Sequence, residues 1–252
     1  MGDGSGGSKS IMHSGTAIIE SAAKVIEKGK QLAGYVLEAA PADIAFEHGR
    51  FVIVGTDRTV SIMELAQKLH GDLKLPADAP QSLDVVHVSD GPGASTYPNG
   101  CHVAEVEIDQ DTGIVEVVNF VAVDDVGRVI NPMIVEGQVQ GGVAQGIGQA
   151  LLENGIYDQS GQLLSGSFMD YTMPRADNLP NITVGTESTL CTHNPLGVKG
   201  CGEVGAIGSP PAVINAIIDA LKDYGVRHLD MPATGEKLWS IIRGNAPRMA
   251  AE

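Results

Sequence analysis

Apolar residues recur every three or four positions over five stretches of the chain, and this spacing predicts amphipathic helices. The second of these stretches begins with a capping box from Ser61 to Glu64. The fourth has Ser209 as its expected N-cap, followed by Pro210 and Pro211 at the first helical positions. Helices are therefore predicted over 10–39, 61–70, 132–153, 210–224 and 235–243.

Runs rich in β-branched residues, bounded by turn residues, predict strands and hairpins between these helices. The longest is a hairpin whose turn runs from Asp109 to Gly113. The expected strands and hairpins cover 50–55, 83–88, 101–125, 155–166 and 181–188. Because helices and hairpins alternate irregularly, the pattern favours an α+β fold with mixed or antiparallel sheets over a doubly wound parallel fold.

The length of 252 residues allows one large domain or two modest ones. We treat 1–252 as one region, with two subdomains expected over roughly 1–125 and 126–252. Near the end of the chain, Trp239 and its apolar neighbours are expected to belong to the core.

The formal net charge is −15, without long runs of one sign, which argues against a nucleic-acid or anionic-membrane partner. No apolar stretch approaches the length that spans a bilayer. Cys101, Cys191 and Cys201 form no CxxC pair, so neither a disulfide framework nor a zinc site is predicted. The seven histidines show no ligand spacing, and no metal-ligating side chains are assigned. A reducing cytoplasm is the expected location.

Thirty-two glycines are present, and they concentrate at 2–7, 137–148 and 197–208. In the first segment, Gly6, Gly7 and Ser8 precede a helix, where free N–H groups and the positive helix end suit a phosphate. A flexible chain terminus explains this segment equally well.

The second glycine segment coincides with a predicted helix, although each interior glycine costs about 1 kcal/mol relative to alanine. Glutamines interleave with the glycines, including Gln145. This composition is typical of backbone packed against a polar, planar group. A close helix–helix crossing is the structural alternative, and the two interpretations are compatible.

In the third glycine segment, Glu203 is the only acid of the loop 197–208. It lies six residues before the expected cap at Ser209, and a helix dipole acts only over its first turn. We therefore expect no role for Glu203 at that helix end. A solvated loop glutamate and a functional carboxylate remain.

Four segments in order resemble one family, the molybdenum hydroxylases, which include xanthine dehydrogenase, aldehyde oxidase and the large subunits of aerobic carbon monoxide dehydrogenases. The segments are "GSGGSKS", "VDDVGRVINPMIVEGQVQGGVAQGIGQAL", "GSFMDYTMPRA" and "NPLGVKGCGEVGAIGSPPAVINAIIDAL". The resemblance spans essentially the whole chain and corresponds to the C-terminal, cofactor-binding part of the family's large subunit.

The resemblance implies a molybdopterin cofactor, in bacteria usually the cytosine dinucleotide form, whose molybdenum is held by the pterin dithiolene. Glu203 in "KGCGE" is similar to the family's catalytic base, which takes a proton while oxygen attacks an electron-poor carbon. A carboxylate shielded from water is a stronger base, which suits this task.

The resemblance also implies cofactor contacts elsewhere in the chain. Gln145 is similar to the amide that bonds a molybdenum ligand, and Gly6, Gly7 and Ser8 resemble part of the diphosphate site. Asp125 and Val126 resemble the nucleotide end, with valine where many relatives have cysteine. Lys199 and Gly202 would line the cofactor loop.

The implied partners are the N-terminal half of the large subunit, an iron–sulfur small subunit with two-iron two-sulfur clusters, and a medium subunit with FAD. The full complex is expected to be oligomeric and to act on a small molecule. The implied reaction is hydroxylation of a purine, N-heterocycle or aldehyde carbon, or oxidation of carbon monoxide. The chain alone is expected to fold without hydroxylase activity. A non-catalytic apo module that binds cofactor or assists assembly is the alternative.

Overall fold

A computed structural model describes residues 4–71, 73–91 and 93–244. Contacts within the chain divide it into two compact units, of which one contains 1–12 and 94–252 and the other contains 13–93. The expected subdomain boundary near residue 125 falls inside the first unit, directly after a strand. Helices and small mixed or antiparallel sheets make up both units, so the α+β fold class is confirmed.

The unit of residues 13–93 is built around one long helix, α1 (Thr16–Leu37), with a π-helical turn, Ile11–Gly15, before it. A three-stranded antiparallel sheet of β1 (Ile44–Glu47), β2 (Arg50–Ile53) and β3 (Thr59–Ser61) follows. The predicted capping box opens α2 (Ile62–His70), since the Glu64 N–H donates to the Ser61 hydroxyl and the Ser61 N–H donates to the Glu64 carboxylate. Apolar side chains from α1, α2 and the sheet form a separate small core.

The strand expected over 83–88 is absent, because side chains of α1 hold this segment instead of a neighbouring strand. The Lys28 ammonium donates to the Asp84 carbonyl, and His87 lies 2.7 Å from both Lys24 Nζ and Glu20 Oε2. Val86 is 96% exposed. The alternation of apolar residues was therefore a wrong indication of strand structure here.

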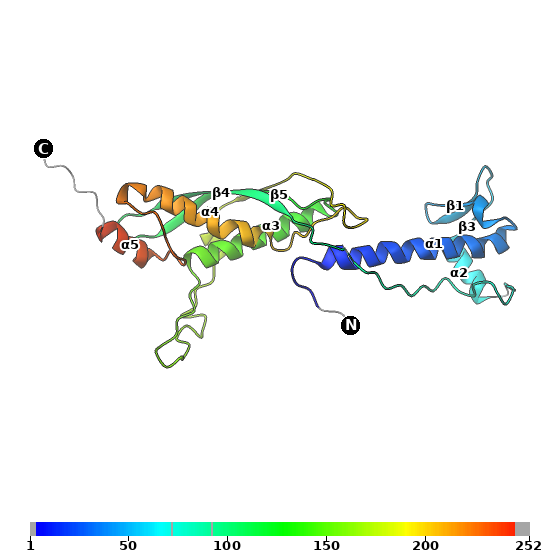
Figure 1. Cartoon of the computed structure of the whole chain (residues 1–252), viewed down its shortest axis with the longest axis horizontal. Helices are drawn as coiled ribbons and strands as arrows, with labels where there is room; N and C mark the ends of the chain where they lie inside the picture. The colour runs from blue at the N-terminus through cyan, green and yellow to red at the C-terminus, as the bar shows by residue number, and fades with distance from the viewer. Residues whose placement is uncertain (1–3, 72, 92, 245–252) are drawn as a thin grey trace. The chain divides into compact units, whose positions relative to one another are not determined.

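The other unit contains the second sheet, with β4 (Asn99–Ile108) antiparallel to β5 (Val115–Asp125) and β5 parallel to β6 (Ile182–Thr186). The predicted hairpin and its turn are confirmed, since the Gly113 N–H donates to the Asp109 carbonyl. One face of this sheet packs on two helices, α3 (Pro132–Leu151) and α4 (Val204–Ala220), which run beside each other in Figure 1. The sheet and these helices share the larger core, with Phe120, Val143 and Ile217 completely buried.

The fourth predicted helix begins earlier than expected: Glu203 is the N-cap of α4, and Ser209, Pro210 and Pro211 lie inside it. Proline cannot donate the bond that an interior residue normally gives, so a helix continuing through two prolines needs other support. The Ser209 hydroxyl donates to the Gly205 carbonyl at 2.7 Å, and the first turn packs on α3. Our exclusion of Glu203 from the helix end was therefore wrong.

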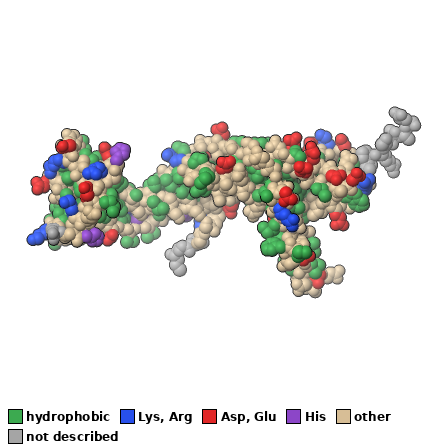
Figure 2. All heavy atoms as spheres, turned by 180° about the vertical axis from the view of Figure 1, so that it is seen from behind, with side chains coloured by type: hydrophobic (Ala, Val, Ile, Leu, Met, Phe, Trp, Pro, Cys, Tyr) green, Lys and Arg blue, Asp and Glu red, His purple; other side chains and the backbone are tan. Residues whose placement is uncertain are grey.

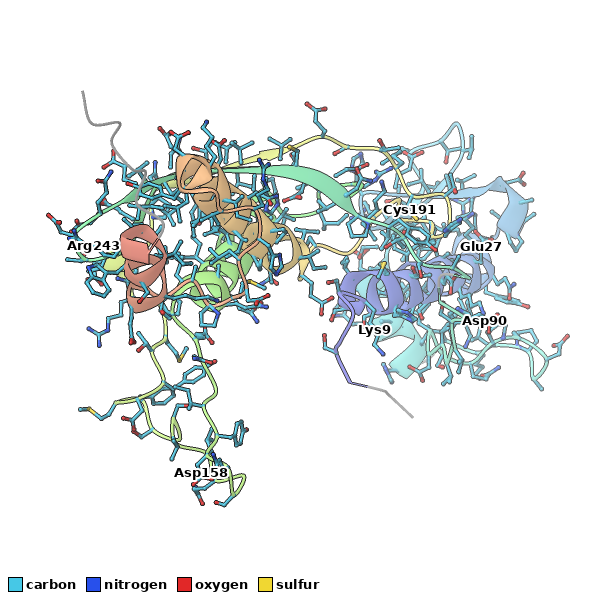
Figure 3. All side chains as sticks on the ribbon, turned by 60° about the vertical axis from the view of Figure 1, so that its left-hand side comes forward. Lys9, Glu27, Asp90, Asp158, Cys191 and Arg243 are labelled. Carbon is cyan, nitrogen blue, oxygen red and sulfur yellow. The ribbon has the colours of Figure 1, made fainter. Side chains whose placement is uncertain are left out.

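Residues 152–175 connect α3 to the segment before β6 and project from the end of α3, with Asp158 near the tip in Figure 3. The hairpin expected at 155–166 is reduced to one antiparallel bridge between Tyr157 and Leu163. Figure 2 shows hydrophobic side chains on the surface of this projection, where Phe168 is 83% exposed.

A short 3-10 turn, Ala176–Asn178, leads toward β6, and another, Lys222–Tyr224, follows α4. The last helix, α5 (Gly235–Gly244), matches the prediction. Within it, Leu238 and Ile242 are buried, but Trp239 is 42% exposed, so its placement in the core was wrong. Among the residues described, no helix combines the length and apolar content needed to cross a membrane.

Candidate functional site

The segment from Gly197 to Glu203 passes from the interior of its unit to the surface. Residues 197–200 are buried, Cys201 is half-buried, and Gly202 and Glu203 are exposed. The Glu203 carbonyl accepts the first helical bond of α4 from the Ile207 N–H at 3.0 Å. Its carboxylate therefore lies at the N-terminus of α4, where the helix dipole favours negative charge.

The Glu203 carboxylate is held by the opening glycine segment, almost two hundred residues away in the sequence. The Ser8 hydroxyl donates to Glu203 Oε2 at 2.9 Å. A Cβ built at Gly200 would lie 2.6 Å from the Ser8 Cβ, so only glycine allows this close approach. The structure thus brings Ser8, Gly202 and Glu203 together, with Gly6 and Gly7 exposed beside them in the sequence.

Asp125 and Lys199 form a buried ion pair beneath this surface, with Lys199 Nζ donating to Asp125 Oδ2 at 2.6 Å. The N–H groups of Gly127 and Thr189 donate to the other carboxylate oxygen at 2.9 Å and 3.1 Å. Burial acts to raise the pKa of Asp125, but Lys199 and the two N–H donors outweigh it and hold this pKa at about 2. The two side chains satisfy each other and anchor the loop.

The α3 glycines fall into two groups. A Cβ at Gly142 would lie 2.8 Å from the Ala206 nitrogen, and one at Gly146 would lie 2.7 Å from Pro210 Cδ, so both permit close contact with α4. At Gly137 and Gly141, a Cβ would have no atom of another described residue within 4 Å, apart from the adjoining backbone of α3 itself. The helix–helix crossing thus explains only part of the glycine content, and the exposed side of α3 remains open.

Two glutamines lie on this open side. Gln145 is exposed and sits two helical turns from Gln138, so both amides project from the same stripe of α3. The Gln138 Oε1 lies 3.6 Å from the Cβ position of Gly202, beside Glu203. The sequence placed Gln138 among the glutamines that interleave with the helical glycines, but it gave a site role to Gln145 alone.

Val126 is 2% exposed. It lines a cavity of about 170 Å³ together with Ile11, Ile134, Val198 and Cys201. Burial raises the pKa of the Cys201 thiol. The Val126 carbonyl accepts the Lys199 N–H at 2.8 Å, so Val126 contributes backbone and packing to the site.

A second buried acid, Asp124, was also missed from the sequence. Its two carboxylate oxygens each lie 3.2 Å from His102 Nε2, and both side chains are almost completely buried. They lie beside a cavity of about 390 Å³ between the start of β4 and α4. Nothing in the local sequence links the two residues, because β-sheet pairing alone brings them together.

Within residues 4–71, 73–91 and 93–244, no group of three or more His, Cys, Asp or Glu side chains is placed to hold a metal ion. The polar groups on the open surface are instead hydroxyl, amide and carboxylate groups beside exposed glycines. These groups suit hydrogen bonding to a large polar cofactor that brings its own metal ligands.

Comparison with known proteins identifies the family. Residues 1–180 match the family described as the molybdopterin cofactor-binding domain. The chain is 37% identical over 246 residues to the gamma subunit of the 6-hydroxypseudooxynicotine dehydrogenase complex of Paenarthrobacter nicotinovorans, covering 96% of this chain and 30% of the relative.

Solved structures agree with this match. The structure of reconstituted CO dehydrogenase from Oligotropha carboxidovorans superposes with a TM-score of 0.89 at 32% identity, covering 98% of this chain and 31% of that one. Quinoline 2-oxidoreductase from Pseudomonas putida 86 gives a TM-score of 0.84 at 38% identity, covering 96% and 31%. The chain spans just under a third of the length of these relatives. The sequence resemblance is confirmed: this chain belongs to the molybdopterin cofactor-binding domain family and corresponds to the cofactor-binding part of a molybdenum hydroxylase large subunit.

Proposed function

We propose that this chain supplies one wall of a molybdenum hydroxylase active site, with Glu203 as the catalytic base. The observation that carries the proposal is the position of the carboxylate. It is exposed at the start of α4, oriented by the Ser8 hydroxyl, and beside the open stripe of α3 that carries the two glutamines. When bound, the molybdopterin cofactor supplies the redox centre that accepts electrons from the substrate.

The residues on this surface fit such a group. Gly137 and Gly141 leave space for close approach to α3, and Gln138 and Gln145 offer amide donors and acceptors above it. Gly6 and Gly7 are exposed, and the N–H groups of such a glycine segment suit a diphosphate, so we propose the cytosine dinucleotide form of the cofactor. Lys199 is paired with Asp125, so we assign both to holding the loop rather than to direct contact with the nucleotide.

Glu203 can accept a proton at Oε1, because the Ser8 hydroxyl bonds only Oε2 and Oε1 has no hydrogen-bond partner within the described ranges. In this chain the carboxylate is exposed, so the shielding from water that strengthens a base has to come from surfaces outside the described residues. We propose the remainder of a large subunit for this role, with iron–sulfur and FAD subunits receiving the electrons in the cytoplasm.

The proposed substrate is a small molecule. The relatives named above are a 6-hydroxypseudooxynicotine dehydrogenase, a CO dehydrogenase and a quinoline oxidoreductase, so the same wall serves different substrates in the family. We propose oxidation of an N-heterocycle, purine or aldehyde carbon, or of carbon monoxide.

The test is the E203Q variant in the assembled enzyme. Loss of general base catalysis typically costs about 10²–10⁴-fold in rate, so turnover should fall by that factor. Molybdenum content should remain near that of the unmodified enzyme, since the substitution keeps the size and hydrogen-bonding capacity of the side chain.

The matched control is E107Q, which neutralises an exposed glutamate on β4. Turnover of E203Q within threefold of that of E107Q would contradict the role of Glu203 as the catalytic base. It would favour the alternative, a non-catalytic module that binds cofactor or assists assembly.

A further inference from the structure

Two consecutive acids, Asp124 and Asp125, end β5. They contact the chain on the two sides of the turn that carries Glu203, residues 199–203, here called the Glu203 turn. Successive side chains of a strand point to opposite faces, so Asp124 and Asp125 diverge. Asp125 contacts Lys199, four residues before Glu203. Asp124 contacts His102, whose ring lies against α4 after Glu203.

The contact before Glu203 combines charge and backbone pairing. The buried Lys199–Asp125 bond of 2.6 Å is accompanied by an antiparallel bridge between Gly127 and Val198. A Cβ at Gly127 would lie 2.8 Å from the Lys199 nitrogen, so the two segments are in close backbone contact. This side of the turn is therefore fixed to the end of β5.

The contact after Glu203 runs through a histidine. The side chain of His102 is only 4% exposed, and its Nε2 bonds the Asp124 carboxylate. The imidazole packs on Gly208, where a Cβ would lie 2.6 Å from the ring Cε1. Gly208 is five residues after Glu203, so this ring fixes the second turn of α4 relative to the sheet.

We propose that Asp124 and Asp125 are positioning residues that brace the two sides of the Glu203 turn, through His102 on one side and Lys199 on the other. The turn itself contains Gly200 and Gly202, and glycine backbone has many accessible conformations. The only side-chain bond to the Glu203 carboxylate from the described residues is that from the exposed Ser8 region. The two buried acids, rather than the turn residues, determine where the carboxylate lies.

The importance of this position rests on the proposed function, but the brace can be tested without cofactor or turnover. Cys201 is half-buried between Lys199 and Glu203, and its thiol reports how often the turn opens. The probe is iodoacetamide, with peptide mass spectrometry to separate Cys201 from Cys101 and Cys191. The D125N/K199M variant removes both charges while keeping similar side-chain volumes.

We expect Cys201 in D125N/K199M to be alkylated about tenfold faster than in the unmodified chain, because the turn opens more often. The matched control is D219N/K222M, which removes an exposed aspartate–lysine pair at the other end of α4. An unchanged rate of Cys201 alkylation in D125N/K199M, or an equal increase in the control, would overturn the proposal that Asp125 positions the Glu203 turn through Lys199. If D125N/K199M lacks a cooperative thermal transition, D125N alone replaces it with the same two outcomes.

The other side of the brace is tested with D124A and D124N, followed by amide hydrogen exchange of residues 204–208. D124A removes the acceptor of His102 and should speed exchange about tenfold, whereas D124N keeps an acceptor oxygen and should stay close to the unmodified chain. Equal exchange in D124A and D124N would overturn the role of Asp124. Neither readout involves turnover, so the two proposals can fail separately. Unchanged alkylation and exchange together with slow turnover of E203Q would overturn only the brace. Faster alkylation and exchange together with normal turnover of E203Q would overturn only the proposed function.

Discussion

The two sides of α3 use the same residue type for opposite purposes. On the side that faces α4, Gly142 and Gly146 allow close contact with residues 205–210 of that helix. On the open side, a Cβ at Gly137 or Gly141 would meet no described residue outside the backbone of α3, and glutamines lie beside them. A glycine inside a helix lowers its stability, so each such glycine needs a reason. On the side that faces α4 the reason is close helix packing, and on the open side, we propose, it is close approach of the cofactor.

The sharpest test of this difference is a pair of identical substitutions at adjacent positions. In G142A, the new Cβ would lie 2.8 Å from the Ala206 nitrogen and 2.9 Å from the Gly205 Cα. Since both are backbone atoms, the helices must separate, and overpacking of this kind costs about 1–3 kcal/mol. The same methyl group also adds up to about 1 kcal/mol of helix propensity, so the free energy of unfolding, measured by urea titration, should fall by the overpacking cost less this gain. A gain in stability equal to that of G141A would show that the crossing has room for a methyl group.

A second test concerns the buried Asp125–Lys199 ion pair, which anchors the loop before Glu203. The pKa of Asp125 is about 2 in the folded chain, below its usual 3.8, so its ionisation stabilises the fold above pH 4. As pH falls from about 4 to 2, protonation should remove about 2 kcal/mol of stability.

The variant D125N lacks this ionisation, so its stability should depend less on pH in that window. The difference in unfolding free energy between the unmodified chain and D125N should shrink between pH 6 and pH 3. A difference that stays constant over this range would show that the carboxylate contributes nothing through its charge.

The smallest expected effect on stability comes from the other half of the glycine pair. In G141A, the new methyl group meets no neighbour, so the variant should gain up to about 1 kcal/mol of stability from helix propensity. If the open side of α3 approaches the cofactor, the same methyl should lower molybdenum content in the assembled enzyme. Full molybdenum content in G141A would show that the cofactor does not approach α3 closely at Gly141.

Much of the architecture follows from local sequence signals. The capping box at Ser61 and Glu64, the turn from Asp109 to Gly113 and the long apolar pattern of α3 each depend on neighbouring residues, so the sequence predicts them. The four family segments are local too, and their order along the chain is enough to indicate the family. Glu203 stood out because it was the only acid in a glycine-rich loop.

What only the tertiary structure decided depends on residues that are distant in the chain. The start of α4 follows from the contact of Gly205 with Gly142, which outweighs the local start signal of Ser209, Pro210 and Pro211. The segment 83–88 has the pattern of a strand but no strand to pair with among the described residues.

The two acid pairs at the end of β5 show the same limit, because sheet register and loop closure bring Asp124 to His102 and Asp125 to Lys199. The periodicity of apolar residues shows which side chains prefer burial. Close packing and ion pairing depend on which residues, distant in the sequence, the fold brings next to each other. The sequence by itself therefore determined the family and most of the elements. The tertiary structure decided how the Glu203 turn is held, since the atoms that hold it lie up to 195 residues away.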